Sequence, residues 1–426
     1  MGARTQTPRT QSRLGGLALA APLGLVMCSS GAPLEHASDP DASAAVHGNQ
    51  GSGSGGSSGS NAPGSGYDGS ASAGSDSGSA ASPPPGTEGG VPATGAPASC
   101  PASDVGNTPL GKDTPDATGT AVDAITYTGV GAAGSYDQVV SSTMAPTCVA
   151  NTCNKSPKSV SGPLVPFNEE MTMVFSGPMD LYQVAAYEPA AGGYSRVAYW
   201  DRCTSEGLAF VGNKHWYTCG GNVQSYVSPD GTKESATPVL FGGHLDAGVG
   251  VNVMSATPCA GTAAGTDCGF SLGLALHGFA GDAAGSKIFA TKLRMPVGNV
   301  TPAYWILPAQ VVRSSQYGCN CRGEGGQGGC GELDVAEVLG GNTATPAHPM
   351  QATTTIYSFQ GVTNGGTSYF QRPVYETATF LVIFDAPSQS IALRRLAATD
   401  FDFAATVSSA TVGAWLAQAG TTRKMP

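Results

Sequence analysis

The sequence predicts an all-β fold, a sandwich or barrel of antiparallel strands, and three observations support this prediction. Short apolar or alternating runs of about four to eight residues recur from residue 121 onward. Gly, Pro, Asn or Asp residues separate these runs, as they do in β-turns. Long helical periodicity is absent from the same region, except at residues 412–419. Such closely spaced short runs are typical of a β sandwich. Examples are Met171–Phe175, Tyr182–Tyr187, Lys287–Met295, Tyr304–Leu307, Thr353–Ser358 and Thr379–Phe384.

The N-terminus has the pattern of an export signal. Arg4, Arg9 and Arg13 precede an apolar run, Leu14–Met27, which is too short to span a bilayer. A cysteine directly after such a run resembles a bacterial lipobox, so residues 1–28 are predicted to be a lipoprotein signal peptide with lipidation at Cys28. Simple secretion with cleavage nearby is the alternative. Either way, the chain is expected outside the cytoplasm, as a cell-envelope lipoprotein or a secreted protein.

Residues 29–120 are predicted to be a flexible tether. They are rich in Gly, Ser, Ala and Pro and poor in large apolar residues, so they cannot bury enough surface to offset the entropy of ordering. They also carry most of the formal net charge of -10. The remainder is mildly acidic without a basic stripe, which argues against a nucleic-acid partner. After the tether we expect an N-terminal β region at 121–200 and a larger β domain at 201–426.

Cysteine usage predicts disulfides. The chain has 11 cysteines, and an even number remains once the candidate lipidation site is set aside. In an exported protein an even set indicates disulfide bonds. A zinc site at Cys319, Cys321 and Cys330 is the alternative. The close pairs are Cys148 with Cys153, Cys203 with Cys219, and Cys259 with Cys268, and the others are Cys100, Cys319, Cys321 and Cys330.

The segment 331–339, GELDVAEVL, concentrates three acids, Glu332, Asp334 and Glu337. Asp and Glu are poor strand residues, so three on one strand need a functional reason. Glu332 and Asp334 share a face through the two-residue period of a strand. A β-bulge near Val335 and Ala336 would return Glu337 to that face. The outer glutamates would then lie about 13 Å apart at Cα. Side chains leaning inward could narrow their carboxyl groups to about 5–5.5 Å, the separation of a retaining glycosidase.

The same segment also fits a short amphipathic helix. Leu333, Ala336 and Leu339 recur at helical spacing, and acids suit a helix N-terminus. The flanking Gly and Cys residues and the β-rich surroundings favour the strand.

Here the sequence resembles known families. The motif from Glu332 to Glu337 matches the bulged E-x-D-x-x-E motif of glycoside hydrolase family 16. An ordered series of segments is similar to the fungal "target of SBF" cell-wall protein family, which is related to family 16. The series covers most of residues 122–395. Its segments are Tyr127–Tyr136, Gly162–Glu170, Phe175–Tyr187, His277–Phe279, Met295-Pro296, Pro302–Gly318, Cys330–Leu339 and Tyr369–Pro373.

The resemblance implies a concanavalin-A-like jelly-roll sandwich, with the smaller N-terminal β region packed on it. It implies that Glu332 is the nucleophile, that Glu337 is the general acid and then the base, and that Asp334 orients or electrostatically supports Glu332. The fungal pattern commonly has a histidine on the following strand, where this chain has Tyr357. No organic cofactor and no catalytic metal are implied. Family-16-like sandwiches often hold a structural calcium ion, for which no ligand set is readable in this sequence.

Sugar binding also needs flat aromatic surfaces and hydrogen-bonding groups. Candidate platforms are Tyr304, Trp305, Tyr357 and Tyr369, each of which could instead be a core residue. Arg313, Gln316 and Arg372 could hydrogen-bond sugar hydroxyls or form structural ion pairs. His277 fits a satisfied buried histidine better than a ligand.

The function predicted from the sequence is retaining endo-hydrolysis of a β-glucan, with β-1,3-glucan implied by the resemblance. The predicted partners are the polysaccharide and, through the N-terminal lipid anchor, a membrane, and the chain is expected to be a monomer. The alternatives are a transglycosylase using the same site, a non-catalytic glucan-binding module of the cell wall, and a structural surface lipoprotein.

Overall fold

The computed structural model describes residues 106–143, 152–213, 223–261, 267–298, 300–314, 321, 328–339 and 348–426. The predicted signal peptide, Cys28, most of the tether and Gln316 lie outside the described residues.

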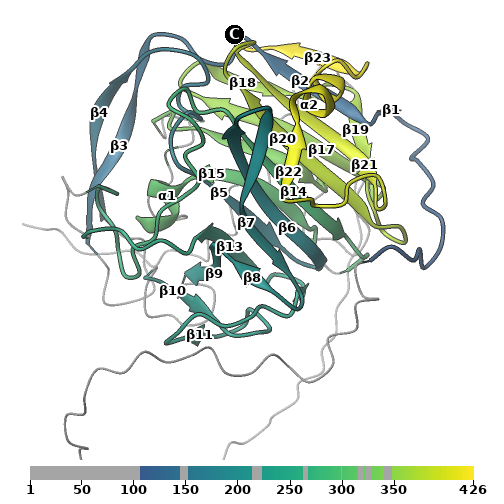
Figure 1. The fold of residues 1–426 in the computed structure, drawn as a ribbon, viewed down its shortest axis with the longest axis horizontal. Helices are drawn as coiled ribbons and strands as arrows, with labels where there is room; N and C mark the ends of the chain where they lie inside the picture. Colours follow the sequence, from purple (N-terminus) through teal and green to yellow (C-terminus); the bar gives the residue numbers. More distant parts are fainter. Residues whose placement is uncertain are drawn as a thin grey trace, which may run out of the picture. The chain divides into compact units, whose positions relative to one another are not determined.

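Two large sheets account for most strands (Figure 1). The first sheet runs in the order β1 (Thr120–Ala121), β19 (Ser368–Gln371), β17 (Gln351–Ser358), β16 (Glu332–Glu337), β15 (Ala303–Pro308), β5 (Met171–Ser176), β13 (Gly250–Ser255), β9 (Leu208–Asn213), β10 (Gln224–Val227) and β11 (Glu234–Ser235), with β18 (Gly361–Asn364) paired to β17. The second sheet runs in the order β22 (Thr406–Ser408), β7 (Gly193–Asp201), β6 (Met179–Ala190), β14 (Lys287–Arg294), β20 (Ala378–Asp385), β21 (Ser390–Ala397), β2 (Ala124–Thr128) and β23 (Thr421–Lys424), with β12 (His244–Leu245) on β6 and β8 (Ser205–Glu206) on β7.

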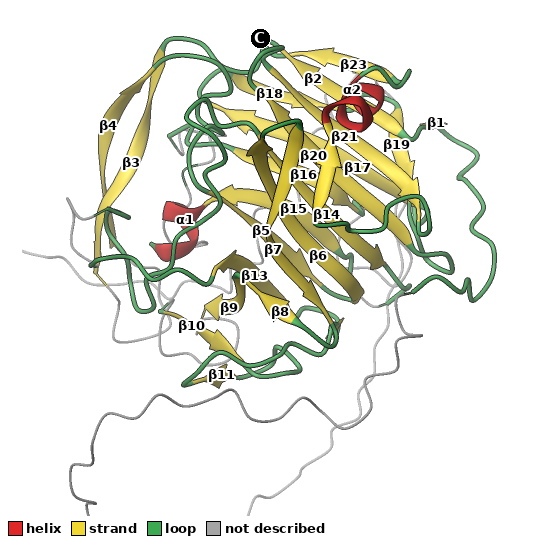
Figure 2. Cartoon of the chain, viewed as in Figure 1, coloured by secondary structure: helices red, strands yellow, loops and turns green. Residues whose placement is uncertain are grey.

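The described residues form few other elements. Strands β3 (Gly134–Thr143) and β4 (Thr152–Val160) form a separate hairpin. The helices among the described residues are α1 (Ala309–Arg313) and α2 (Ser409–Leu416), both short (Figure 2). No described helix has the length and apolar character needed to cross a bilayer. The predicted all-β sandwich is confirmed, and the jelly-roll assignment stays a prediction.

One hydrophobic core lies between the two sheets. Its members come from strands of both sheets and are almost all fully buried. Aromatic pairs join the sheets across the core. Trp200 of β7 meets Phe210 of β9 with ring centroids 5.1 Å apart, and Phe370 of β19 meets Phe380 of β20 at 5.7 Å. Since each large side chain buries apolar area on both sheets, these contacts hold the layers in a fixed relation.

Strands from either side of residue 200 share both sheets. Strand β5 lies between β15 and β13, and β6 lies between β7 and β14. Residues 121–200 therefore contribute interior strands to the same core as the later residues, and the sheets do not divide at residue 200.

The chain already packs on the sandwich before residue 121. Asp113 is 6% exposed, and its carboxylate accepts hydrogen bonds from the backbone N–H groups of Val374, Tyr375 and Glu376 at 3.0–3.2 Å. The backbone N–H of Leu110 donates to the carbonyl of Tyr375. These polar contacts to a distant loop hold a segment whose composition alone indicates a tether.

Two disulfides are fully described. Cys259–Cys268 confirms the pair predicted from spacing. Cys321–Cys330 overturns the zinc alternative, because sulfurs joined to each other are not available as thiolate ligands. Cys153 and Cys203 are also disulfide-bonded. Cys100, Cys148, Cys219 and Cys319 lie outside the described residues.

Truncating Phe370 to alanine should destabilise the fold strongly. Phe370 is fully buried between the sheets, so Phe370→Ala is expected to lower the free energy of unfolding by about 3–5 kcal/mol. Val362→Ala is the matched control on neighbouring β18, where the side chain is 44% exposed, and should change it by less than about 0.5 kcal/mol. Urea unfolding followed by tryptophan fluorescence measures both. Equal losses in the two variants would contradict the placement of the core.

Candidate active site

The acidic segment 332–337 is an extended strand with a bulge. Strand β16 pairs with β15 and with β17, and both pairings shift register inside it. Tyr304 lies opposite Ala336 while Trp305 lies opposite Asp334, so one residue, Val335, is extra on β16. Against β17 there is likewise one extra residue between Asp334 and Glu337. The predicted strand and its bulge are confirmed, and the helical alternative is wrong.

The bulge brings all three acids to one face of the first sheet. Leu333, Val335, Ala336 and Val338 all belong to the core between the sheets. Two consecutive core residues, Val335 and Ala336, are possible only because the bulge interrupts the two-residue alternation. The residues left for the opposite face are Glu332, Asp334 and Glu337. We call this face of the first sheet, turned away from the core, the acidic face.

Burial makes these carboxylates unusual. Glu332 is 5% exposed and Asp334 is 7% exposed, whereas Glu337 is partly exposed. Burying a carboxylate costs free energy unless hydrogen bonds or charges compensate for the lost water. Buried carboxylates two residues apart on one strand are a pattern that catalytic sites share with structural ion-pair networks.

Threonine side chains stabilise the bulge. A bulge leaves a residue outside the regular ladder of backbone hydrogen bonds. The fully buried Thr354 of β17 donates its hydroxyl proton to the carbonyl of Asp334 at 2.6 Å and accepts one from the hydroxyl of Tyr127 at 3.2 Å. Thr353 donates to the carbonyl of Glu337 at 3.1 Å. These contacts support the strand at the residues that precede and follow the bulge.

Tyr127 is fixed as a donor in this arrangement. Burial raises the pKa of its hydroxyl well above the ordinary value, and the charge of nearby Asp334 raises it further. The hydroxyl therefore stays protonated and continues to donate to Thr354. Neither residue belongs to the predicted site, because their contribution depends on a pairing between strands distant in sequence.

Trp305 and Tyr357 share the acidic face. Trp305 lies opposite Asp334, and Tyr357 lies opposite Glu332, and directly opposed residues of an antiparallel pair point to the same side. Trp305 is 9% exposed and Tyr357 is partly exposed. Both predicted platforms are thus brought to the predicted acids. Thr355 of β17 lies opposite Asp334 and two residues before Tyr357.

Tyr304 was wrongly predicted as a sugar platform. It belongs to the core, is fully buried, and stacks on Phe175 with ring centroids 4.7 Å apart. The reason is the strand period of two, which sends adjacent Tyr304 and Trp305 to opposite faces.

Tyr369 and Arg372 were also wrongly predicted to contact substrate. Tyr369 is 1% exposed, because the segment before β1 covers it, and its hydroxyl donates to the carbonyl of Asp116. Arg372 is 1% exposed, and its guanidinium donates to the carbonyls of Met295, Pro296 and Pro349. It fixes loops instead of reaching a ligand.

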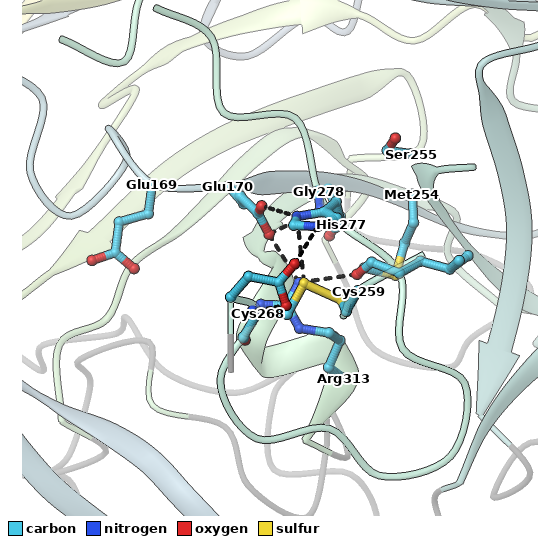
Figure 3. A network of polar contacts seen from close by, with 12 residues as sticks. Glu169, Glu170, Met254, Ser255, Cys259, Cys268, His277, Gly278 and Arg313 are labelled. Atoms are coloured by element: carbon cyan, nitrogen blue, oxygen red, sulfur yellow. Dashed lines mark hydrogen bonds and ion pairs between the residues drawn. A yellow bond between two sulfur atoms is a disulfide. The ribbon is translucent and has the colours of Figure 1, made fainter. Parts of the chain in front are cut away.

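Arg313 belongs to a second polar network (Figure 3). Its guanidinium donates to a carboxylate oxygen of Glu170 at 3.0 Å and to the carbonyls of Cys268 and Leu276. His277 contacts Glu170 through Nδ1 at 2.5 Å and Asp267 through Nε2 at 3.2 Å. His277 is thus a satisfied, partly buried histidine, as expected from the sequence. It also lies near the sulfurs of Cys259 and Cys268, which their disulfide removes as thiolate metal ligands.

Glu170 is held ionised by this network. Burial opposes its ionisation, but the hydrogen bond with His277, the charge of Arg313 and the backbone N–H of Gly278 outweigh it, so its pKa lies below the ordinary value. Figure 3 shows the side chain of the adjacent Glu169 pointing away from this network.

Family models cover most of the sandwich. The model "Cell wall protein YJL171C/Tos1, C-terminal" matches residues 192–415, and the N-terminal model of the same name matches residues 123–189. No solved structure matches the chain.

Curated relatives are fungal. The chain is 28% identical over 330 residues to the probable circularly permuted 1,3-beta-glucanase PGA52 of Candida albicans. The match covers 70% of this chain and 83% of the relative. It is 30% identical over 257 residues to the probable circularly permuted 1,3-beta-glucanase TOS1 of Saccharomyces cerevisiae, covering 55% of this chain and 52% of the relative. It is 26% identical to YJL171C of the same yeast, which has the same description, over 68% of this chain and 79% of the relative.

Removing the hydroxyl of Thr354 should weaken the bulge. Thr354→Val deletes a buried hydrogen bond to the Asp334 carbonyl and is expected to lower the free energy of unfolding by about 1–3 kcal/mol. Thr379→Val is the matched control, because Thr379 is equally buried on β20 and its hydroxyl has no partner among the described residues. Its replacement should be neutral or stabilising. A larger loss in Thr379→Val than in Thr354→Val, measured by urea unfolding, would exclude the proposed support.

The interactions of Glu170 should make the free energy of unfolding depend on pH in the acid range. Because the pKa of Glu170 is depressed in the folded state, its contribution is present above the unfolded-state pKa of about 4.3 and is lost as the pH falls through the folded pKa. The free energy of unfolding, followed from about pH 7 to about pH 3, should therefore fall more steeply for the wild type than for Glu170→Gln. Parallel profiles for the two proteins would show that this carboxylate is not the titrating group.

Proposed function

Because the chain belongs to the YJL171C/Tos1 family of cell wall proteins, we propose that it is a glycoside hydrolase that acts on β-1,3-glucan outside the cytoplasm. The relatives' names support the class of reaction and substrate. The observation that carries the proposal is the placement of Glu332, Asp334 and Glu337 on one sheet face by a single bulge. Three acids on one sheet face meet the need of most glycoside hydrolases for a pair of carboxyl groups.

We assign the reaction to a double displacement. The carboxylate of Glu332 attacks the anomeric carbon while Glu337 gives its proton to the departing glycosidic oxygen, so the C–O bond of the glucan breaks and a glycosyl ester forms. A water molecule then attacks the same carbon. Glu337 takes the water's proton, the ester bond breaks, and the sugar leaves with its original anomeric configuration.

Asp334 and Trp305 would assist in different ways. Asp334 lies between the two glutamates, and its charge disfavours ionisation of Glu337, which must hold a proton to act as an acid. Its charge also favours the positive character that develops on the sugar ring in the transition state. Trp305, beside Asp334, offers an aromatic surface to the apolar face of a sugar.

The location proposed for the chain follows from its family and its N-terminus. A cell wall location agrees with the export pattern of residues 1–28. Lipid attachment at Cys28 would hold the enzyme at a membrane surface, with the Gly- and Ser-rich segment allowing it to reach polysaccharide.

Replacing either outer glutamate should abolish turnover. Glu332→Gln and Glu337→Gln keep the shape of the side chain, and Glu337→Gln should lower kcat on β-1,3-glucan by about 10²–10⁴-fold. Glu332→Gln cannot form the glycosyl ester, so this variant should bind glucan without cleaving it. Glu206→Gln on exposed β8 is the matched control and should retain full activity. Release of reducing ends measures turnover, and NMR of the first product gives its anomeric configuration.

Two results would overturn the proposal. Full activity in Glu332→Gln would show that Glu332 is not the nucleophile. A first product with inverted anomeric configuration would exclude the double displacement. A gain in chain length with an added acceptor sugar would instead identify transglycosylation through the same intermediate.

A further inference from the structure

A cavity of about 320 Å³ lies on the outer face of the second sheet, on the opposite side of the sandwich from the acidic face. Asp180, Arg294 and Thr377 are part of its lining. Arg294 pairs with Asp180, and it lies beside Thr377 because Leu293 pairs with Ala378. The residues next to these three along the chain belong to the core between the sheets, so the row points away from the core. Nothing in the proposed reaction uses this cavity.

The end of the predicted tether forms one wall of the cavity. Asn107, Thr108 and Leu110 all line it. The ammonium group of Lys292 on β14 donates to Oδ1 of Asn107 at 3.1 Å, and the backbone N–H of Leu110 donates to the carbonyl of Tyr375 at 2.9 Å. These bonds hold the segment against β14 and against the loop before β20. The cavity therefore depends on the packing of a segment whose composition is that of a linker.

Tyr375 presents an exposed aromatic ring on a fixed loop. Its side chain is 49% exposed and lines the cavity. Its backbone N–H, together with those of Val374 and Glu376, donates to the buried carboxylate of Asp113. The loop is thus held by its backbone, and the ring stays open to solvent. A ring presented on a fixed loop loses little freedom when a ligand binds to it.

The open surfaces of the cavity combine apolar and polar groups. Only six large apolar side chains are well exposed in the part of the chain that the structure describes, and two of them, Leu110 and Tyr375, line this cavity. Tyr375 is the aromatic one among the six. The exposed Asn107 and Thr108 add an amide and a hydroxyl group. A sugar needs this combination, because its ring has an apolar C–H face and hydroxyl groups at its edge.

The charged groups of the cavity are engaged with the protein. The carboxylate of Asp180 contacts Nδ1 of His244 at 2.7 Å and accepts from Nε and Nη2 of Arg294 at 3.1 and 2.6 Å. The guanidinium of Arg202 lies over the ring of Tyr182, 4.3 Å from its centroid, and donates to a backbone carbonyl of β6 at 2.9 Å. An ion would have to compete with these partners. The cavity therefore suits a neutral ligand.

We propose that this cavity is a second glucan-binding site, in which a sugar ring stacks on Tyr375 and its hydroxyl groups bond to Asn107 and Thr108. The ligand class rests on the proposed function, whereas the site itself goes beyond it. Because the site faces away from the three acids, it holds polysaccharide without contributing to bond cleavage. It keeps the enzyme on insoluble glucan, since a chain held at one face raises the effective concentration of glucan at the other.

Adhesion to insoluble β-1,3-glucan particles tests the site, in the full chain carrying Glu332→Gln so that the particles are not consumed. Adding Tyr375→Ala should weaken adhesion about 3–10-fold, because it removes the ring and leaves the backbone bonds to Asp113 in place. Tyr375→Trp keeps an aromatic ring and should preserve adhesion. Val197→Ala is the matched control, because Val197 is 43% exposed on β7 of the same sheet and does not line the cavity. It should leave adhesion unchanged.

Turnover in the protein with Glu332 intact separates the two sites. A soluble β-1,3-linked tetrasaccharide is too short to reach both outer faces of two stacked sheets. Tyr375→Ala should therefore slow the degradation of particles more than the cleavage of the tetrasaccharide. Equal losses on the two substrates would exclude a site separate from the acids.

The adhesion results also distinguish this site from the hydrolase proposal. Adhesion that is absent in the parent, or equal in the parent and Tyr375→Ala, would exclude the second site while the hydrolase proposal stands. If Tyr375→Ala lowers adhesion of a protein whose wild type cleaves no glucan, the second site stands and the hydrolase proposal fails.

Discussion

One extra residue in strand β16 is the constraint on which the site depends. Without it, the strict alternation of a strand would place Glu337 in the hydrophobic core and expose Ala336. The bulge lets two consecutive residues, Val335 and Ala336, pack between the sheets. As a result, three acids share a face while Val335 and Ala336 both stay in the core. The hydroxyls of Thr353 and Thr354 support the strand on either side of this irregularity.

The same alternation organises the neighbouring strands. Trp305 shares the acidic face and Tyr304 faces the core, although the two are adjacent in sequence. The core face is thus continuous across strands, and the opposite face carries the three acids together with Trp305 and a second hydrophobic cluster that includes Val174 and Leu307. Rigid sheets suit catalysis because they hold reacting groups within narrow tolerances. The sandwich, built by strands from both halves of the chain, supplies that rigidity.

The sequence predicts the parts of the fold that depend on local pattern. The two-then-three spacing of Glu332, Asp334 and Glu337 is enough to infer a bulged strand, and short cysteine spacing is enough to infer Cys259–Cys268. The sequence does not predict features that depend on contacts between residues far apart along the chain. The hydrogen bond from Thr354 to the bulge requires the register of β17, and the packing of residues 106–120 requires a buried Asp113 to meet a loop some 260 residues later. Which adjacent aromatic faces the core is likewise fixed only when both sheets are in place.

The central claim is that Glu332 becomes covalently linked to the sugar during turnover, and trapping that intermediate tests it most directly. A β-1,3-linked glucan fragment with fluorine at the sugar's second carbon and a good leaving group should form the glycosyl ester quickly and hydrolyse it slowly. Mass spectrometry of the digested protein should then find one sugar adduct, on the peptide containing Glu332. An adduct on a different carboxylate, or turnover of this reagent without any adduct, would contradict the account.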